Sequence, residues 1–221
     1  MDAEELILLY NQAVFDTDRD GALGVIRNAL QAGMSPEEIV FKVIIPAVDE
    51  TIAMIETDNS FCLAQHFMTA QIASDVVDEM LPLFKLEAQY KGKVVLGSAF
   101  GDLHSLGKRI VAGCLRAHMI EVIDLGVNVT AERFVEEALA HKVEVIAISS
   151  MMMHTARGEN GALKIRKILQ ERNLNGIKLV VGGAPFRFNP ELYKLVQADA
   201  WAPDGVSASR VILDLIKEVQ G

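Results

Sequence analysis

The chain has 221 residues, of which 51% are hydrophobic, enough to bury one sizeable core or two smaller ones. Its 21 Lys and Arg against 30 Asp and Glu give a formal net charge of −9 without a basic block, which argues against binding nucleic acid through its phosphates. Two cysteines without CxxC spacing, no basic and apolar leader and no unbroken apolar run of about 18 residues predict a cytoplasmic protein that does not span a membrane.

Helical periodicity runs through residues 2–84 and predicts four helices. The breaks between these helices fall at residues 16–18, 32–35 and 57–60. The third helix has a clear start, because Ser35 can cap it, Pro36 suits the first helical position and Glu38 completes a capping box. In the fourth helix, apolar residues spaced by three and four predict one face turned to a core: Phe61, Ala64, Met68, Ile72, Val76 and Met80.

Short β-branched runs replace the helical pattern after the polar stretch 85–93, and amphipathic segments separate them. The runs lie at residues 93–98, 121–126, 143–149, 177–183 and, more weakly, 198–203. Strands that alternate with helices predict a parallel sheet covered on both faces. The fold class is therefore α/β, with a helical region at residues 1–87 and a doubly wound five-stranded sheet at residues 88–221.

Polar or glycine-rich residues follow three of these strands. The loop GDLHSLG, residues 101–107, follows the first strand, Ser149 ends the third, and Gly182 and Gly183 end the fourth. Because ligands bind beyond the carboxyl ends of the strands in such sheets, we expect these residues to meet at one edge.

Asp102 and His104 are open to three interpretations: a metal pair, a general base with its orienting acid, or a structural histidine with satisfied hydrogen bonds in a polar turn. Zinc requires three or four protein ligands, and no further His or Cys has a convincing spacing. A nucleophile in a G-x-S-x-G turn and a glycine-rich phosphate loop are also missing. The remaining interpretation is an imidazole that offers one nitrogen outward while a carboxylate holds the other.

The pattern Asp102-x-His104-x-x-Gly107, then Ser149-Ser150-Met151, then Gly182-Gly183 resembles the D-x-H-x-x-G, S-x-L and G-G signature of cobalamin-binding domains. Met151 replaces the family's Leu, a change that conserves volume. The resemblance implies a flavodoxin-like domain in which His104 is the lower axial ligand of cobalt and Asp102 holds the other ring nitrogen. It also implies a slot for the nucleotide tail, lined by Gly107, Ser149, Gly182 and Gly183.

A hydroxyl that often extends the His–Asp pair in this family falls on Thr155. Shifting the alignment by one residue makes Ser150 the motif serine and places Ala156 at the position of the hydroxyl. We prefer Ser149, because that choice keeps the apolar strand 145–148 in register with the other strands.

The four helices in front of the sheet extend the resemblance to the small corrinoid proteins of methyltransferase systems, in which a four-helix bundle forms a cap. The implied function is a methyl carrier that cycles between methylcobalamin and cob(I)alamin and is active only with partner enzymes. The implied partners are substrate-side and acceptor-side methyltransferases and a reductive activase, with no nucleic acid and no membrane.

The alternative function is a cobalamin-dependent light or ligand sensor. Some sensors of this kind carry a Glu-His pair with an upstream Trp in the cap helix, whereas this chain has Gln65 and His66 there and its only tryptophan is Trp201. A third class, the small cobalamin subunit of a radical mutase, need not carry a four-helix cap.

Further expectations concern residues around the motif. Asp199, Trp201 and Asp204 resemble the family's closing segment near the nucleotide tail. Lys108 is expected to be solvated. The residues expected to contact the cofactor are Asp102, His104, Ser105, Leu106, Gly107, Ser149, Met151, Thr155, Gly182, Gly183, Trp201, Gln65 and His66.

Overall fold

The computed structural model describes residues 2–57, 63–84, 90–158 and 160–221, without the side chains of residues 52–57, 63–67 and 206. Its contacts divide the chain into two compact units, Met1–Gln89 with Arg116–His118 and Tyr90–Leu115 with Met119–Gly221. The expected division into domains 1–87 and 88–221 stays a prediction, because independent folding of the two parts is a separate property.

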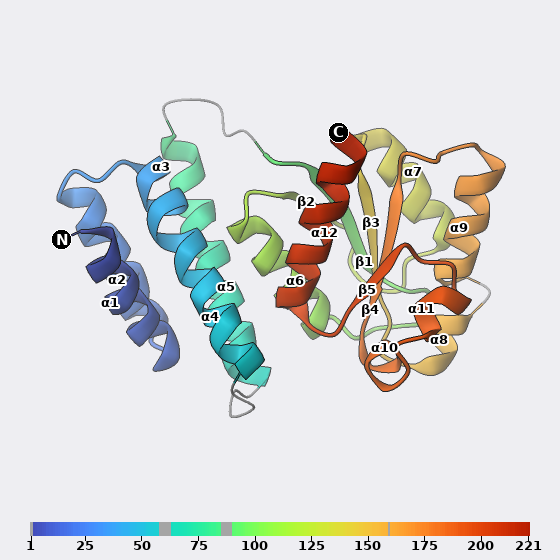
Figure 1. Cartoon of the computed structure of the whole chain (residues 1–221), viewed down its shortest axis with the longest axis horizontal. Coiled ribbons are helices and arrows are strands. Elements are labelled where there is room, and N and C mark those ends of the chain that lie inside the picture. The colour runs from blue at the N-terminus through green and yellow to red at the C-terminus, as the bar shows by residue number, and fades with distance from the viewer. Residues whose placement is uncertain (1, 58–62, 85–89, 159) are drawn as a thin grey trace. The chain divides into compact units, whose positions relative to one another are not determined.

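The four helical stretches expected at the N-terminus are present, and the third consists of three consecutive segments (Figure 1). The elements are α1 Ala3–Phe15, α2 Arg19–Gln31, α3 Pro36–Glu38, the π-helical η1 Ile39–Ile44, α4 Ile45–Thr57, α5 Leu63–Met80 and the 3₁₀ turn η2 Leu81–Leu83. The capping box at the start of α3 is confirmed: Glu38 N donates to Ser35 Oγ at 3.2 Å, and Ser35 N donates to Glu38 Oε2 at 3.3 Å.

The core of the helical unit forms where the apolar stripes of its helices are buried. The predicted stripe of α5 is confirmed at Ile72, Val76 and Met80, which are fully buried. Phe61 and the side chain of Ala64 lie outside the described residues. No helix in the described part of the chain has the length and the hydropathy needed to cross a bilayer.

The second unit is the expected doubly wound parallel sheet, so the predicted fold class is confirmed. Its elements are β1 Lys93–Ser98, α6 Leu106–Ala117, β2 Glu121–Asp124, α7 Ala131–His141, β3 Val145–Ser149, α8 Met153–Arg157, α9 Ala162–Glu171, β4 Lys178–Gly182, α10 Ala184–Phe188, α11 Leu192–Leu195, β5 Ala200–Ala202 and α12 Gly205–Gln220.

The strand order β2-β1-β3-β4-β5 is that of flavodoxin-like sheets. The chain leaves β1 toward one side to form β2 and then crosses to the other side to form β3, so the winding reverses between β1 and β3. Ser149 pairs with Ser98 on β1 and with Gly182 on β4. The three polar or glycine-rich strand ends therefore share one edge, at the switch point where ligands bind in this class of sheet.

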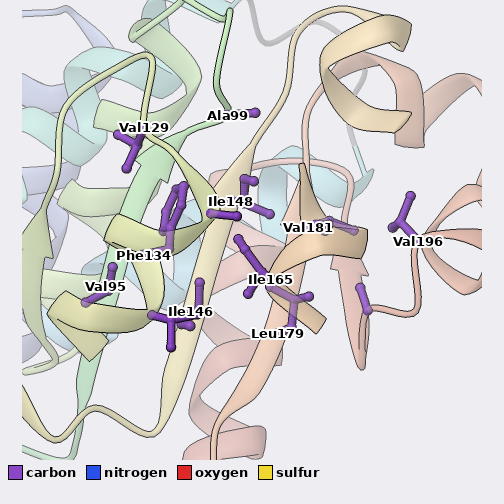
Figure 2. Packing of buried hydrophobic residues seen from close by; sticks show 14 of the residues in the cluster. Val95, Ala99, Val129, Phe134, Ile146, Ile148, Ile165, Leu179, Val181 and Val196 are labelled. Atoms are coloured by element: carbon purple, nitrogen blue, oxygen red, sulfur yellow. The ribbon is translucent and has the colours of Figure 1, made fainter. Parts of the chain in front are cut away.

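Alternating strand residues cover the two faces of the sheet with separate apolar clusters. Val95, Ile146 and Leu179 pack beneath α7 and α9, around Phe134 and Ile165, as Figure 2 shows. The next positions along the same strands face α6 and α12, in the cluster Val94, Leu96, Ala112, Leu115, Ile120, Val145, Ala147, Val180, Ile212 and Ile216. Burial on both faces fixes the sheet rigidly, so its strand ends are a firm support for a site.

Candidate functional site

The loop between β1 and α6 carries Asp102 and His104 and begins with a tight turn. Asp102 N donates to Ala99 O at 2.9 Å, and Gly101 has φ +80°, a conformation that glycine adopts without strain. The turn directs Asp102 inward, where it is 1% exposed, while His104 stays at the surface.

The carboxylate of Asp102 accepts four hydrogen bonds. Oδ1 accepts from His104 Nδ1 at 2.8 Å and from His104 N at 3.0 Å, and Oδ2 accepts from Met151 N at 2.6 Å and Thr155 Oγ1 at 3.0 Å. Burial raises the pKa of this carboxyl, but the bonds from Met151, His104 and Thr155 outweigh burial and lower the pKa below its usual value. Asp102 is thus an ionised acceptor that joins the loop after β1 to the segment after β3.

His104 offers a single free nitrogen. Its side chain is 56% exposed, and because a carboxylate can only accept, the hydrogen bond to Asp102 places the proton on Nδ1. Within the described residues, Nε2 has no hydrogen-bond partner. A neutral imidazole held in this way presents its Nε2 lone pair outward, which is how proteins orient a histidine that ligates a metal.

The hydroxyl of Thr155 lies between two acceptors. It is buried, 3.0 Å from Asp102 Oδ2 and 2.8 Å from Met152 O, and its one proton can serve only one of them at a time. Ala156, the residue at this position in the alternative alignment, has no hydroxyl to offer.

The glycines of the motif differ in whether the fold of the protein has room for a side chain at their positions. Gly183 has φ +112°, and a Cβ there would lie 2.0 Å from Ser150 O, so the fold demands glycine. At Gly182 a Cβ would meet only Ala202 O at 3.5 Å, and at Gly107 it would meet nothing within 4 Å. Gly107 and Gly182 therefore leave space that no described side chain fills.

The other expected contact residues lie around this edge with differing exposure. Ser105 and Leu106 are exposed where α6 begins, and Met151 is 50% exposed beyond β3. Ser149 ends β3, and its carbonyl accepts from Ala99 N at 2.9 Å. Trp201 lies on β5 and packs against the cluster beneath α7 and α9.

The side chains of Gln65 and His66, on α5, lie outside the described residues. Their expected place above the cofactor stays a prediction.

Two expectations about charged residues are wrong. Lys108 is 3% exposed and its Nζ pairs with both carboxylate oxygens of Asp124 at the end of β2, because its long stem reaches from α6 and the carboxylate compensates its charge. Asp199 precedes β5, where its carboxylate accepts from Leu179 N at 2.6 Å and pairs with Arg166. Leu179 is near the beginning of β4, and Asp199 directly precedes β5. Asp199 therefore lies at the amino ends of the strands, whereas His104 follows the carboxyl end of β1.

Ser98 and Asn128, which lie outside the predicted site, also hold the histidine loop. Buried Ser98 donates from Oγ to His104 O at 2.8 Å, and Asn128 Oδ1 accepts from Gly101 N at 2.8 Å. A hydroxyl at the last position of an apolar strand was a signal for Ser98. Asn128 gave a weaker signal, because the sequence does not show that the segment after β2 lies beside the end of β1.

Comparison with known proteins identifies the family. The B12 binding domain family matches residues 92–212, more than half of the chain. The chain belongs to this family.

Two relatives match almost the whole length of this chain. The trimethylamine corrinoid protein 1 of Methanosarcina acetivorans is 32% identical over 218 residues, 95% of this chain and 98% of the relative. The monomethylamine corrinoid protein 1 of the same organism is 31% identical over 221 residues, 94% and 99% of the two chains. A solved structure of the methanol:cobalamin methyltransferase complex from Methanosarcina barkeri shares the fold, with a TM-score of 0.79, 22% identity and coverage of 98% of this chain and 81% of that chain.

These findings give the cofactor and the class of function. Cobalamin is the cofactor of this chain. The chain is a corrinoid protein with the role of a methyl carrier, as its full-length relatives support. The alternative of a light or ligand sensor finds no support among these relatives.

Proposed function

We propose that the methyl donor of this corrinoid protein is a methylated amine and that His104 is the lower axial ligand of its cobalt. The first part is supported by the two relatives named for trimethylamine and monomethylamine, which match this chain over nearly its whole length. The second part rests on one observation: Asp102 holds Nδ1 of His104, so that Nε2 points outward from the edge of the sheet.

The residues at this edge fit cobalamin in size and chemistry. Gly107 and Gly182 leave room for the nucleotide tail, since no protein atom requires glycine at either position. Leu103, Leu106 and Met151 are 73%, 44% and 50% exposed beside His104, and they offer apolar contact to a large macrocycle. When bound, cobalamin supplies a cobalt centre that takes up a methyl group from one enzyme and releases it to another.

The chain's own residues control the ligand and its proton. Asp102, kept ionised by its hydrogen bonds, favours the proton on Nδ1 and leaves Nε2 free. The hydroxyl of Thr155 lies 3.0 Å from Asp102 Oδ2 and supports this carboxylate from the segment after β3.

The proposed partners are a substrate-side methyltransferase, an acceptor-side methyltransferase and a reductive activase. The methyl group must reach both enzymes, so the upper face of the corrin has to be accessible during transfer. The resemblance implies Gln65 and His66 above that face, and we expect them to clear it when a partner binds. A methyl carrier therefore needs no lasting bond between His66 and cobalt.

The donor is tested by supplying the reduced holoprotein to the methyltransferases of the trimethylamine, dimethylamine, monomethylamine and methanol systems, each with its own substrate. We expect one of the amine enzymes to release its demethylated amine at a rate that rises with the concentration of this protein. Demethylation with the methanol enzyme alone would contradict an amine donor.

The ligand is tested by electron paramagnetic resonance of the Co(II) holoprotein, prepared with histidine labelled by ¹⁵N. The wild type should show nitrogen splitting that changes from a triplet to a doublet on labelling. His104→Ala should lose this splitting. If a histidine signal survives the substitution, His104 is not the ligand.

A further inference from the structure

The segment between β2 and α7, residues 125–130, lies directly against the loop that carries Asp102 and His104. Val129 forms a parallel bridge with Ala99, and Val129 N donates to Ser98 O at 3.0 Å. These backbone contacts continue the pairing of β1 beyond its last residue. They bring Asn128, the residue before Val129, to the turn in front of Asp102.

Asn128 makes hydrogen bonds to the backbone on both sides of the Gly101–Asp102 peptide. Its Oδ1 accepts from Gly101 N at 2.8 Å, and its own N donates to Asp102 O at 2.9 Å. Asn128 has φ 56°, in the left-handed region that asparagine tolerates better than most residues. The conformation thus turns both its side-chain oxygen and its backbone N–H toward the same loop.

The peptide held in this way determines the direction of the Asp102 side chain. Gly101, with φ +80°, has no side chain of its own to fix the turn, and it is exposed. Asp102 in turn fixes His104, since Oδ1 bonds both the ring Nδ1 and the backbone N of that residue. A shift of the Gly101–Asp102 peptide would therefore be passed on to the imidazole.

We propose that Asn128 is a positioning residue for the cobalt ligand: its side-chain oxygen holds the turn that directs His104. The proposal rests on the proposed role of His104. Asn128 acts on the ligand through Gly101 and Asp102 and not by contact with the cofactor. Such supporting contacts commonly decide how well a histidine is presented to a metal.

Two substitutions separate the oxygen from the backbone conformation. Asn128→Gly keeps the left-handed conformation without strain and removes the acceptor. Asn128→Asp keeps an acceptor oxygen at the same position and also tolerates the left-handed region. Because Asn128 is exposed, neither substitution opens a cavity in the core.

The first measurement uses the protein without cofactor and asks whether the contact exists. Hydrogen exchange of the Gly101 amide, followed by nuclear magnetic resonance, should be about threefold to tenfold faster in Asn128→Gly, the factor expected for one net hydrogen bond. Asn128→Asp should exchange like the wild type. Equal exchange in all three proteins would overturn the proposal, and urea unfolding of each shows that any difference is local.

The second measurement uses the Co(II) holoprotein labelled with ¹⁵N-histidine. At equal cobalamin content, the fraction of cobalt with a histidine doublet should fall by about threefold to tenfold in Asn128→Gly and stay close to the wild-type value in Asn128→Asp. An unchanged fraction in Asn128→Gly, or the same loss in both variants, would overturn the proposal. If the wild type itself has no histidine doublet, the role of His104 fails, while the exchange experiment still tests the contact of Asn128.

Discussion

At the scale of single residues, Asp102 organises the site. Its four hydrogen bonds come from two parts of the chain, two from His104 in its own loop and two from Met151 and Thr155 after β3. A buried carboxylate is costly to leave unpaired, so both parts must be in place for it to stay ionised. The direction of His104 therefore depends on β3 as much as on the loop that contains it.

The glycine pair Gly182-Gly183, at the end of β4, gives one prediction for the stability of the fold and another for the binding of cobalamin. Gly183→Ala should destabilise the protein without cofactor by at least about 1–3 kcal/mol, because the new Cβ would collide with Ser150 O and φ is +112°. Gly182→Val should leave the fold intact, since a Cβ there meets only Ala202 O at 3.5 Å, and should prevent binding of complete cobalamin.

Urea unfolding measures the first effect, and visible absorption of bound corrinoid measures the second. Cobinamide, which has no nucleotide tail, is the control ligand and should bind to Gly182→Val better than cobalamin does. Equal loss of both ligands would mean that Gly182 does not line the slot for the tail.

At the scale of elements, the stretch predicted as the third helix shows what periodicity does not reveal. The structure places a π-helical turn, Ile39–Ile44, between α3 and α4, and Ile39, Val40, Val43 and Ile44 are all buried. In a π-turn the hydrogen bonds join residues five apart and not four, as in an α-helix, so the side chains that follow are rotated about the helix axis. Here it lets two adjacent pairs of residues face the core of the helical unit.

Tyr10 on α1 provides the prediction at this scale. Its ring is 1% exposed, and its hydroxyl has no hydrogen-bond partner among the described residues. Burial and then the negative charge of Asp75 raise the pKa of the Tyr10 hydroxyl, so it stays protonated. Since an unpaired buried hydroxyl costs about 1–3 kcal/mol, Tyr10→Phe should stabilise the protein by roughly 1 kcal/mol.

The denaturation midpoint in urea measures this change. Tyr10→Ala is the matched control, because it removes the ring as well and should cost about 3–5 kcal/mol. A Tyr10→Phe protein that is clearly less stable than the wild type would show that the hydroxyl has a partner.

At the scale of the whole molecule, the sheet unit has a core of its own. Among the described residues, the clusters on the two faces of the sheet consist of residues between Val94 and Ile216. The residues proposed to hold the nucleotide tail and the cobalt, among them Gly107, Gly182 and His104, lie in this unit. The boundary between residues 87 and 88 lies outside the described residues and stays a prediction.

We therefore expect a fragment of residues 88–221 to fold and to bind cobalamin through His104. Far-ultraviolet circular dichroism should show a cooperative unfolding transition, and the Co(II) spectrum should show the histidine splitting of the full chain. The fragment with His104→Ala is the control for the ligand. A fragment that is unfolded, while the full chain binds cobalamin, would refute the boundary.

The sequence by itself determined the alternation of strands and helices, the capping box at Ser35 and the placement of the D-x-H loop, Ser149 and the glycine pair at strand ends. These features depend on local periodicity and spacing, which the order of residues expresses directly. Only the tertiary structure decided that Asn128 meets Gly101, that Lys108 is buried against Asp124 and that Asp199 lies at the opposite edge from His104. Each of those contacts joins segments whose distance depends on which strands are neighbours, and neighbour order results from packing both faces of the sheet rather than from any local pattern.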